Sequence, residues 1–217
     1  MSVLPFQTDG EVAIAIPKVL AHLEGGRLLA YPTETVYGLG SRARDPDVRA
    51  LAALKGRAAG KPFLLLITGR EMAEAHGLAF NESAQALARA FWPGPLTLVL
   101  PGGSGRLPDL LRGPEGGIAV RWTSHRQIAR LVAAMGEPLT STSANLPGGM
   151  PAPGAEAIVR DFTTAVQGGT LLVLDGGVLG NRPPSTVVDC TGLEARLVRP
   201  GAISVAALRR AAGILAP

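Results

Sequence analysis

The sequence predicts an α/β fold in which a twisted, mixed sheet is flanked by helices. Short apolar runs, typical of buried strands, alternate with segments whose apolar residues recur every three or four positions, as in helices. The last apolar runs follow one another without an intervening helix, so we expect a mixed rather than a purely parallel sheet. No internal repeat or linker divides the 217 residues, and we therefore expect one domain over residues 1–217.

The predicted helices are recognised by their apolar spacing and by the residues at their ends. The first ends at Gly25-Gly26, after apolar residues at helical spacing. The second begins at Asp45-Pro46-Asp47, with an Asp cap and a Pro in the first turn, and ends near Gly56. The remaining helices are expected at residues 81–91, 128–135, 155–162 and 204–213, with Asn81 and Ser204 as caps.

The predicted strands are the short apolar runs between these helices. Aromatic residues make up only 4% of a chain that is 47% hydrophobic, so the core must consist of Leu, Val, Ile and Ala. The 28 Gly and 18 Pro cluster between the runs and indicate tight loops. Strands are expected at residues 27–31, 63–67, 96–100, 117–121, 139–142, 171–174, 186–190 and 196–199, with a Gly- and Pro-rich loop at residues 101–116.

Charge and cysteine content exclude several classes of function. The net charge of +4 is spread out without a run of five or six Lys and Arg, which argues against a nucleic-acid tail or a polybasic membrane patch but allows a basic ligand cleft. One cysteine, Cys190, and three His cannot form an intrachain disulfide or a Cys/His metal cluster. Neither a signal peptide nor an apolar stretch of about 18 residues is present, so we expect a cytoplasmic protein that does not enter a membrane.

The segment from Tyr31 to Gly40 combines hydroxyls, a carboxylate and glycines at the end of a strand. Thr33 and Thr35 flank Glu34, and alternate residues of an extended segment share a face. Both hydroxyls would then point toward a polar ligand such as an amino acid. The alternative is that these hydroxyls bind only the local backbone.

Lys55, Arg57 and Lys61 place cations at a helix end and in the loop after it. An Arg fork and mobile Lys ammonium groups would neutralise a triphosphate. The alternative is that positive residues simply favour the C-terminus of a helix because of its dipole.

Short polar residues alternate at the end of the strand at residues 139–142. Ser141, Ser143 and Asn145 could bind ligand oxygens at the carboxyl edge of the sheet, where α/β folds usually bind ligands. The alternative is an ordinary turn before Pro147. Neither a P-loop nor a Gly-x-Ser-x-Gly motif is present. Arg121 and Arg199 each close an apolar run and could face the same cleft.

Seven short motifs follow one another along the chain. They are Tyr31-Pro-Thr-Glu-Thr-Val-Tyr-Gly-Leu39, Lys55-Gly-Arg57, Phe91-Trp-Pro-Gly-Pro-Leu-Thr-Leu-Val99, Ala119-Val-Arg121, Thr142-Ser-Ala-Asn145, Ser185-Thr-Val-Val-Asp189 and Val198-Arg-Pro-Gly201. In their types and order they resemble the motifs of the YrdC-like family of threonylcarbamoyl-AMP synthases. The chain resembles the short, single-domain members of this family from about residue 10 to residue 201.

The resemblance implies a nucleotidyltransferase that makes threonylcarbamoyl-AMP and pyrophosphate from L-threonine, bicarbonate or CO2, and ATP, with Mg²⁺. A separate transferase complex would then modify tRNA beside the anticodon. No acid or base is assigned; Lys55 and Arg57 would act by positioning, and Glu34 is only a candidate metal ligand. The threonine site would comprise Thr33, Thr35, Arg121, Ser141 and Ser185, and the ATP site Lys55, Arg57, Lys61, Ser143, Asn145 and Arg199. A His that some relatives carry near the end of the strand at residues 63–67 is replaced here by apolar residues.

Two other classes of function fit parts of the sequence. The basic pI of about 9.8 and the family's link to tRNA are compatible with an RNA-binding module, or with weak binding of tRNA or double-stranded RNA beside an enzymatic role. Few aromatic residues are available for base stacking, which argues against RNA binding as the main role. The third candidate is a carbamoyl-transfer domain of a larger enzyme with the same fold.

Overall fold

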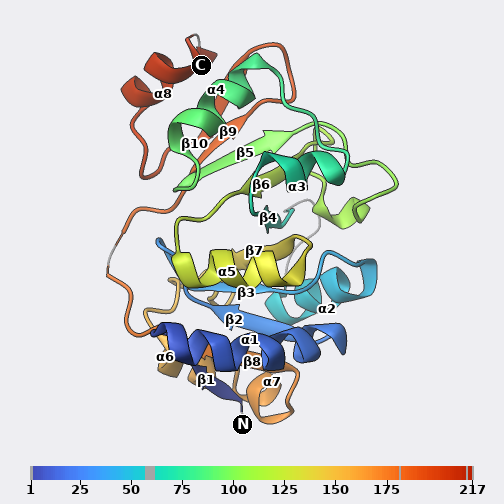
Figure 1. Cartoon of the computed structure of the whole chain (residues 1–217), viewed down its shortest axis with the longest axis vertical. Helices are drawn as coiled ribbons and strands as arrows, with labels where there is room; N and C mark the ends of the chain where they lie inside the picture. The colour runs from blue at the N-terminus through green and yellow to red at the C-terminus, as the bar shows by residue number, and fades with distance from the viewer. Residues whose placement is uncertain (1, 57–61, 181, 214, 217) are drawn as a thin grey trace.

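The computed structural model describes residues 2–56, 62–180, 182–213 and 215–216. Within these residues the strands form one eleven-stranded sheet in the order β1-β8-β2-β3-β7-β4-β6-β5-β9-β10-β11, which extends from the N-terminus at one end of the molecule to the C-terminus at the other (Figure 1). The strands are β1 (Val3–Pro5), β2 (Leu28–Tyr31), β3 (Gly38–Gly40), β4 (Leu64–Leu66), β5 (Leu96–Leu100), β6 (Ile118–Arg121), β7 (Leu139–Ser143), β8 (Leu171–Asp175), β9 (Thr186–Asp189), β10 (Ala195–Arg199) and β11 (Leu215–Ala216).

The sheet is mixed, as the sequence predicts. β8 pairs in parallel with both β1 and β2, and β4–β6 and β5–β9 are also parallel pairs. The inner strand β7 is antiparallel to both of its neighbours, β3 and β4. This arrangement brings the ends of strands that are far apart in the sequence to the middle of the molecule.

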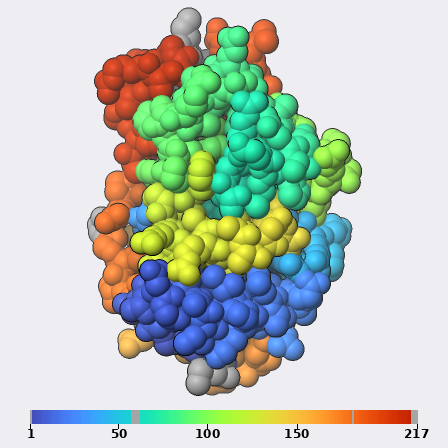
Figure 2. All heavy atoms as spheres, viewed as in Figure 1, coloured from blue at the N-terminus to red at the C-terminus, as the bar shows by residue number. Residues whose placement is uncertain are grey.

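Helices cover both faces of the sheet (Figure 1). Helices α1 and α5 lie side by side on one face of the half that contains β1, β8, β2 and β7, and they form adjacent layers in the space-filling view (Figure 2). The helices are α1 (Asp9–Glu24), α2 (Asp45–Lys55), α3 (Arg70–Ala75), α4 (Glu82–Phe91), α5 (Arg126–Met135), α6 (Ala155–Asp161), α7 (Thr163–Gln167) and α8 (Val205–Ala212), with a 3₁₀ helix at Asp109–Leu111. None of the helices within the described residues is long and apolar enough to cross a membrane.

Strands β2 and β8, which lie inside the edge strand β1, are buried on both faces. In β2, Leu29 and Tyr31 pack with α1 and α5, whereas Leu28 and Ala30 pack into the core on the opposite face. All four side chains are buried. Alternate residues of a strand point to opposite faces, so a strand covered on both sides must be apolar throughout. This explains why β2 reads as a continuous apolar run.

The helix caps agree with the sequence at two positions and differ at a third. Asn81 Oδ1 accepts a 2.8 Å hydrogen bond from the Ala84 amide, and Ser204 caps α8 in the same way. Asp45 does not cap α2, contrary to our prediction: Arg44 holds the cap position, and Asp45 lies inside the helix with a 2.6 Å ion pair to Arg49.

Several short elements were not predicted. Strand β3 begins and ends with a glycine, and the role of both glycines is steric. A side chain on Gly40 would overlap the carbonyl oxygen of Thr140, and one on Gly38 would come within 3.0 Å of the Tyr31 ring. The glycines therefore let Tyr31 lie across β3 and donate a 2.9 Å hydrogen bond to Thr140. β1, β11, α3, α7 and the 3₁₀ helix also lack a clear sequence signal, because they are only a few residues long.

Candidate functional site

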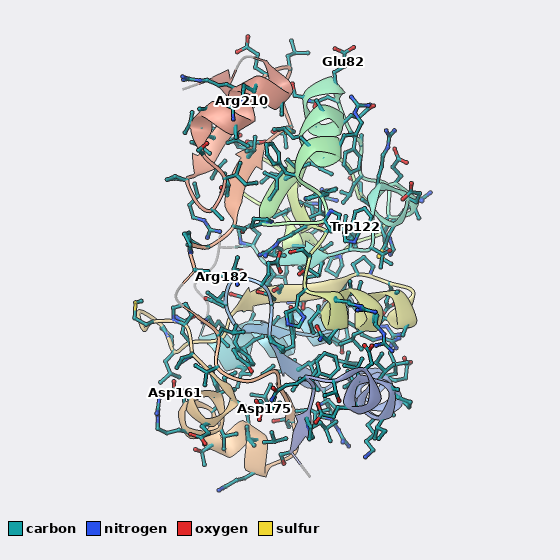
Figure 3. All side chains as sticks on the ribbon, turned by 60° about the vertical axis from the view of Figure 1, so that its left-hand side comes forward. Glu82, Trp122, Asp161, Asp175, Arg182 and Arg210 are labelled. Atoms are coloured by element: carbon teal, nitrogen blue, oxygen red, sulfur yellow. The ribbon has the colours of Figure 1, made fainter. Side chains whose placement is uncertain are left out.

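A cavity of about 400 Å³ lies on the sheet where β7 meets β3 and β4, and it extends along β6, β5 and β9. Figure 3 labels Trp122, which follows the cavity residue Arg121 in the chain. Trp122 and Arg182 both lie near the middle of the molecule in this view. Hydroxyl, guanidinium and small apolar side chains share the lining. The lining residues are Thr33, Thr35, Val36, Gly38, Pro62, Leu64, Thr97, Ala119, Arg121, Ser141, Thr142, Ser143, Pro151, Pro184, Ser185, Val187 and Arg199.

Strand alternation places the lining side chains on one face. Ala119 and Arg121 are two residues apart on β6, and Ser141 and Ser143 are two residues apart on β7. Leu64 of β4 lies opposite Ser141 in the register. Since residues two apart point to the same face, these neighbouring strands together form the floor of the cavity. Every described member of the predicted threonine site lines the cavity, together with Ser143 and Arg199 of the predicted ATP site.

The segment after β2 is a tight bend rather than the extended stretch that we expected. Thr33 Oγ1 donates a 2.6 Å hydrogen bond to the carbonyl of Val36 and accepts bonds from the amides of Thr35 and Val36. Thr33 Oγ1 thus makes the local backbone bonds of the alternative interpretation, although Thr33 also lines the cavity. The two threonine hydroxyls still lie together, with 3.1 Å between their oxygens, because the bend brings them to the same side.

Arg121 is the buried cation of the cavity, with only 4% of its surface exposed. Its Nη2 forms a 2.6 Å ion pair with Glu34, and both terminal nitrogens lie 3.3 Å from Thr35 Oγ1. Its Nε donates to the carbonyl of Gly94. A buried arginine requires such partners, since an unpaired charge away from water is costly.

Glu34 faces Arg121 from the bend. Its carboxylate also accepts a 2.5 Å hydrogen bond from Thr123 Oγ1 and a longer one from the Ser124 amide. Burial alone would raise the pKa of the Glu34 carboxyl, but the Arg121 charge and the hydrogen bond from Thr123 outweigh burial, and the pKa is lowered. Glu34 is therefore a charged partner of Arg121, and these contacts occupy both of its oxygens.

Arg199 brings a second cation to the cavity from β10. Its Nη2 donates to the carbonyl oxygen of Ser185 at 2.8 Å and to its Oγ at 3.1 Å. Ser185 Oγ is also 2.9 Å from Thr97 Oγ1. Burial, followed by the nearby charge of Arg121, lowers the pKa of Arg199. Among the described residues, the carboxylate of Glu34 is the one ion-pair partner of these two guanidinium groups, so the cavity keeps a positive charge that suits an anion.

Lys55, at the end of α2, is bound to the turn after β7. Its Nζ donates to the carbonyl oxygen of Ser143 at 2.8 Å, to Asn145 Oδ1 at 2.7 Å and to the Asn145 carbonyl. The side-chain nitrogen Nδ2 of Asn145 donates to the carbonyls of Leu146 and Gly149. This side chain therefore holds a local turn, as in the alternative interpretation of the motif. Ser143 lines the cavity, whereas Lys55 and Asn145 do not.

Arg57 and Lys61, which we assigned to ATP from the sequence, lie outside the described residues. Gly56 and Pro62 flank them in the chain, and Pro62 lines the cavity.

The described residues do not supply a set of ligands for Mg²⁺. No group of three or more His, Cys, Asp or Glu side chains in the described part of the chain is arranged to hold a metal ion. Among the described residues, those that line the cavity include no Asp or Glu. Hard cations such as Mg²⁺ prefer carboxylate and phosphate oxygens, so this cavity does not fit a protein-held magnesium ion.

Some residues of the site carry no distinctive sequence signal. Thr97 is a single hydroxyl in an apolar strand, and Ala119 and Val187 look like ordinary strand residues. Beside the cavity lies a more apolar groove of about 560 Å³, which includes Pro151 and Leu179. These residues become part of the site only through strand register and loop packing.

Comparisons with known proteins place the chain in a family. A model of the family Sua5/YciO/YrdC, described as "Telomere recombination", matches residues 21–201. The chain belongs to this family. It is 40% identical over 176 residues to a threonylcarbamoyl-AMP synthase of Thiobacillus denitrificans, covering 81% of this chain and 90% of that protein. It is 35% identical over 189 residues to a threonylcarbamoyl-AMP synthase of Pyrococcus abyssi, covering 87% of this chain but only 54% of that protein.

The fold agrees with a solved structure of the same family. The crystal structure of Pyrococcus abyssi Sua5 complexed with L-threonine matches with a TM-score of 0.87 at 31% identity, covering 100% of this chain and 63% of that chain. The Sua5/YciO/YrdC family member described here therefore has the α/β fold that the motifs imply, and it spans about half to two thirds of this longer archaeal relative.

Proposed function

We propose that this protein is an L-threonylcarbamoyladenylate synthase, a nucleotidyltransferase that joins threonine, bicarbonate or CO2, and the AMP part of ATP. The observation that carries the proposal is the buried Arg121, which lines the cavity together with the hydroxyls of Ser141 and Ser185. A fixed cation beside several hydroxyls suits a small hydroxy amino acid. The names of the relatives and the threonine complex of Sua5 support the same substrate.

In this proposal the threonine carboxylate binds Arg121, and its hydroxyl and amine face Thr33, Thr35, Ser141 and Ser185. A carboxylate matches the planar guanidinium donor. Leu64, Ala119 and Val187 offer apolar contacts for the methyl group at the floor of the same cavity. The position of the His found in some relatives is apolar here, so threonine recognition would not use an imidazole at this strand.

ATP would bind beside the threonine, with its phosphates near Arg199 and Ser143. Arg57 and Lys61 remain assigned to ATP from the sequence. Lys55 and Asn145 would support the phosphate site by holding the segment that carries Ser143. Because the described cavity lacks carboxylates, we propose that Mg²⁺ arrives as part of the substrate, bound to the phosphates of ATP.

The proposed reaction does not need a protein nucleophile. The threonine amine and bicarbonate form a carbamate and water. A carbamate oxygen then attacks the α-phosphorus, the bond to the bridging oxygen of pyrophosphate breaks, and pyrophosphate leaves with the bond electrons. Arg199 and the loop cations would stabilise the departing charge, and the cavity would hold the two anions in contact.

The product would be passed to a threonylcarbamoyl transferase complex that modifies tRNA. Both ATP and tRNA are cytoplasmic molecules, so a cytoplasmic location is part of the proposal. Weak contact with tRNA or double-stranded RNA is an additional expectation from the sequence, separate from the enzymatic role.

Measuring pyrophosphate release tests the proposal. Release should require ATP, threonine and bicarbonate together, and omission of any one should reduce it to background. Valine, which lacks the hydroxyl, should be a much poorer substrate, because the polar groups of the cavity would be left unpaired. Release that is independent of threonine, or equal with valine, would contradict the proposed substrate.

A further inference from the structure

The carboxylate of Glu34 connects two segments that are far apart in the sequence. Glu34 belongs to the bend after β2, whereas Thr123 and Ser124 lie between β6 and α5. Thr123 donates from its hydroxyl to Oε2, while Oε1 receives Arg121 at 2.6 Å and the Ser124 amide at 3.3 Å. Only 12% of the Glu34 side chain is exposed, and Thr123 is 1% exposed. The carboxylate is therefore held in place from both sides.

These contacts determine the orientation of the Arg121 guanidinium. Nε is directed to Gly94, Nη2 to Glu34 and Thr35, and Nη1 to Thr35. A guanidinium group has five N–H donors in one plane. Four of these donors of Arg121 point to the described partners, which fixes the plane of its guanidinium group. The fifth donor, the second N–H of Nη1, belongs to the same side chain, and Arg121 lines the cavity.

We propose that Glu34 is a positioning residue that holds Arg121 for the carboxylate of the amino-acid substrate. This inference rests on the proposed function for the identity of the ligand. In this inference Glu34 belongs to the amino-acid site because it orients Arg121. This role takes the place of the metal-ligand role for which the sequence made Glu34 a candidate.

Simple electrostatics makes the opposite prediction, which gives the proposal a sharp test. A negative charge beside Arg121 opposes the binding of a second carboxylate. If Glu34 acted only as a counter-charge, its removal would strengthen threonine binding. If it acts by positioning, its removal weakens threonine binding, because the guanidinium group loses its fixed plane.

The test compares Glu34→Ala, Glu34→Gln and Thr123→Val with Glu115→Ala. Glu34→Gln keeps one oxygen that can accept from Arg121, and its NH2 group, in the place of Oε2, can donate to the Thr123 hydroxyl instead of accepting from it. Thr123→Val removes only the hydroxyl donor to Glu34. Glu115→Ala is the matched control, because it removes an exposed carboxylate that pairs with a different arginine, Arg196.

Two readouts are needed, and the first does not depend on substrate. The Arg121 Nε–H resonance in a ¹⁵N NMR spectrum, assigned with Arg121→Lys, reports whether the guanidinium is held. Threonine and ATP affinities are then measured separately by calorimetry. We expect Glu34→Ala to broaden or shift the Arg121 resonance and to weaken threonine binding by at least about tenfold, the lower end of the loss seen when groups that orient metal ligands are removed. ATP affinity should change little.

The variants should differ in a defined order. Glu34→Gln should retain the Arg121 resonance and most of the threonine affinity. The threonine affinity of Thr123→Val should lie between those of Glu34→Gln and Glu34→Ala. Glu115→Ala should match the wild type in both readouts. An unchanged Arg121 resonance in Glu34→Ala, or tighter or unchanged threonine binding, would overturn the positioning role. If the wild type binds no threonine, the proposed function fails, and the Arg121 resonance still decides whether Glu34 holds the guanidinium.

Discussion

The ammonium nitrogen of Lys55 lies 2.7 Å from Oδ1 of Asn145. The same ammonium binds the carbonyl of Ser143, so a buried cation joins the end of α2 to the turn after β7. Lys55 thus contacts the backbone that presents Ser143 to the cavity. Its contribution to an ATP site would be largely through the geometry of that turn.

Replacing Lys55 with Met should therefore lower stability as well as ATP affinity. Loss of hydrogen bonds from a charged donor costs about 2 kcal/mol, which corresponds to a fall in melting temperature of roughly 4–8 °C for a chain of this size. Lys18→Met is the control, because Lys18 is an exposed lysine of α1. Unchanged melting with lost ATP binding would instead assign Lys55 to the phosphates alone.

Arg199→Ala should weaken ATP binding far more than threonine binding. Within the described part of the chain, Arg199 has no carboxylate partner, and its guanidinium group donates to Ser185 instead. Loss of one charge-assisted contact costs about 1.5–3 kcal/mol, or more than tenfold in affinity. Calorimetry with each substrate measures the two effects. Arg210→Ala, at an exposed position of α8 (Figure 3), should leave both affinities unchanged.

Gly40→Ala should destabilise the protein strongly. The new methyl group would overlap the Thr140 carbonyl in the neighbouring strand, and the backbone of β3 cannot move without disturbing Tyr31. Overpacking of this kind costs on the order of 3 kcal/mol. Gly10→Ala in α1 is the control, since no heavy atom lies within 4 Å of its new methyl group. Equal free energies of unfolding for the two variants, measured by urea denaturation, would show that β3 does not need glycine.

The free energy of unfolding should fall in acid partly through Glu34. Its pKa in the folded protein is lower than its ordinary value of 4.5, so its ionised form stabilises the fold above that pH. This contribution is lost as the pH falls through the lowered pKa and the carboxylate is protonated beside Arg121. Glu34→Gln should therefore show a shallower loss of stability below pH 4.5 in urea titrations than the wild type. A steeper or identical dependence would contradict the role of the ion pair.

Much of the fold could be predicted from local sequence patterns. Strands such as β2 and β8 are apolar runs because both of their faces are covered, and Asn81 and Ser204 mark helix starts by satisfying exposed amides. Strand β3 could not be predicted in this way. Its glycines have low strand propensity, and they are required only because Tyr31 and Thr140 approach from neighbouring strands.

The candidate site, like the fold, could be predicted only in part from the sequence. The residue types of Thr35, Arg121 and Ser141 indicated a polar anion site, and strand alternation brings them to one cavity. Their partners could not be predicted. The pairing of Glu34 with Arg121 depends on a bend that we expected to be extended, and its contact with Thr123 joins residues 89 positions apart. Similarly, a lysine at a helix end does not reveal that its ammonium is bound by a distant turn.

The most direct test of the central claim is the identity of the product. The protein should be incubated with ATP, threonine and ¹³C-bicarbonate, and the adenylates should be analysed by mass spectrometry. We predict threonylcarbamoyl-AMP that carries one ¹³C atom, formed in step with pyrophosphate and absent from Arg121→Ala. Pyrophosphate release without this labelled adenylate, or a threonyl-AMP that lacks the bicarbonate carbon, would contradict the proposed reaction.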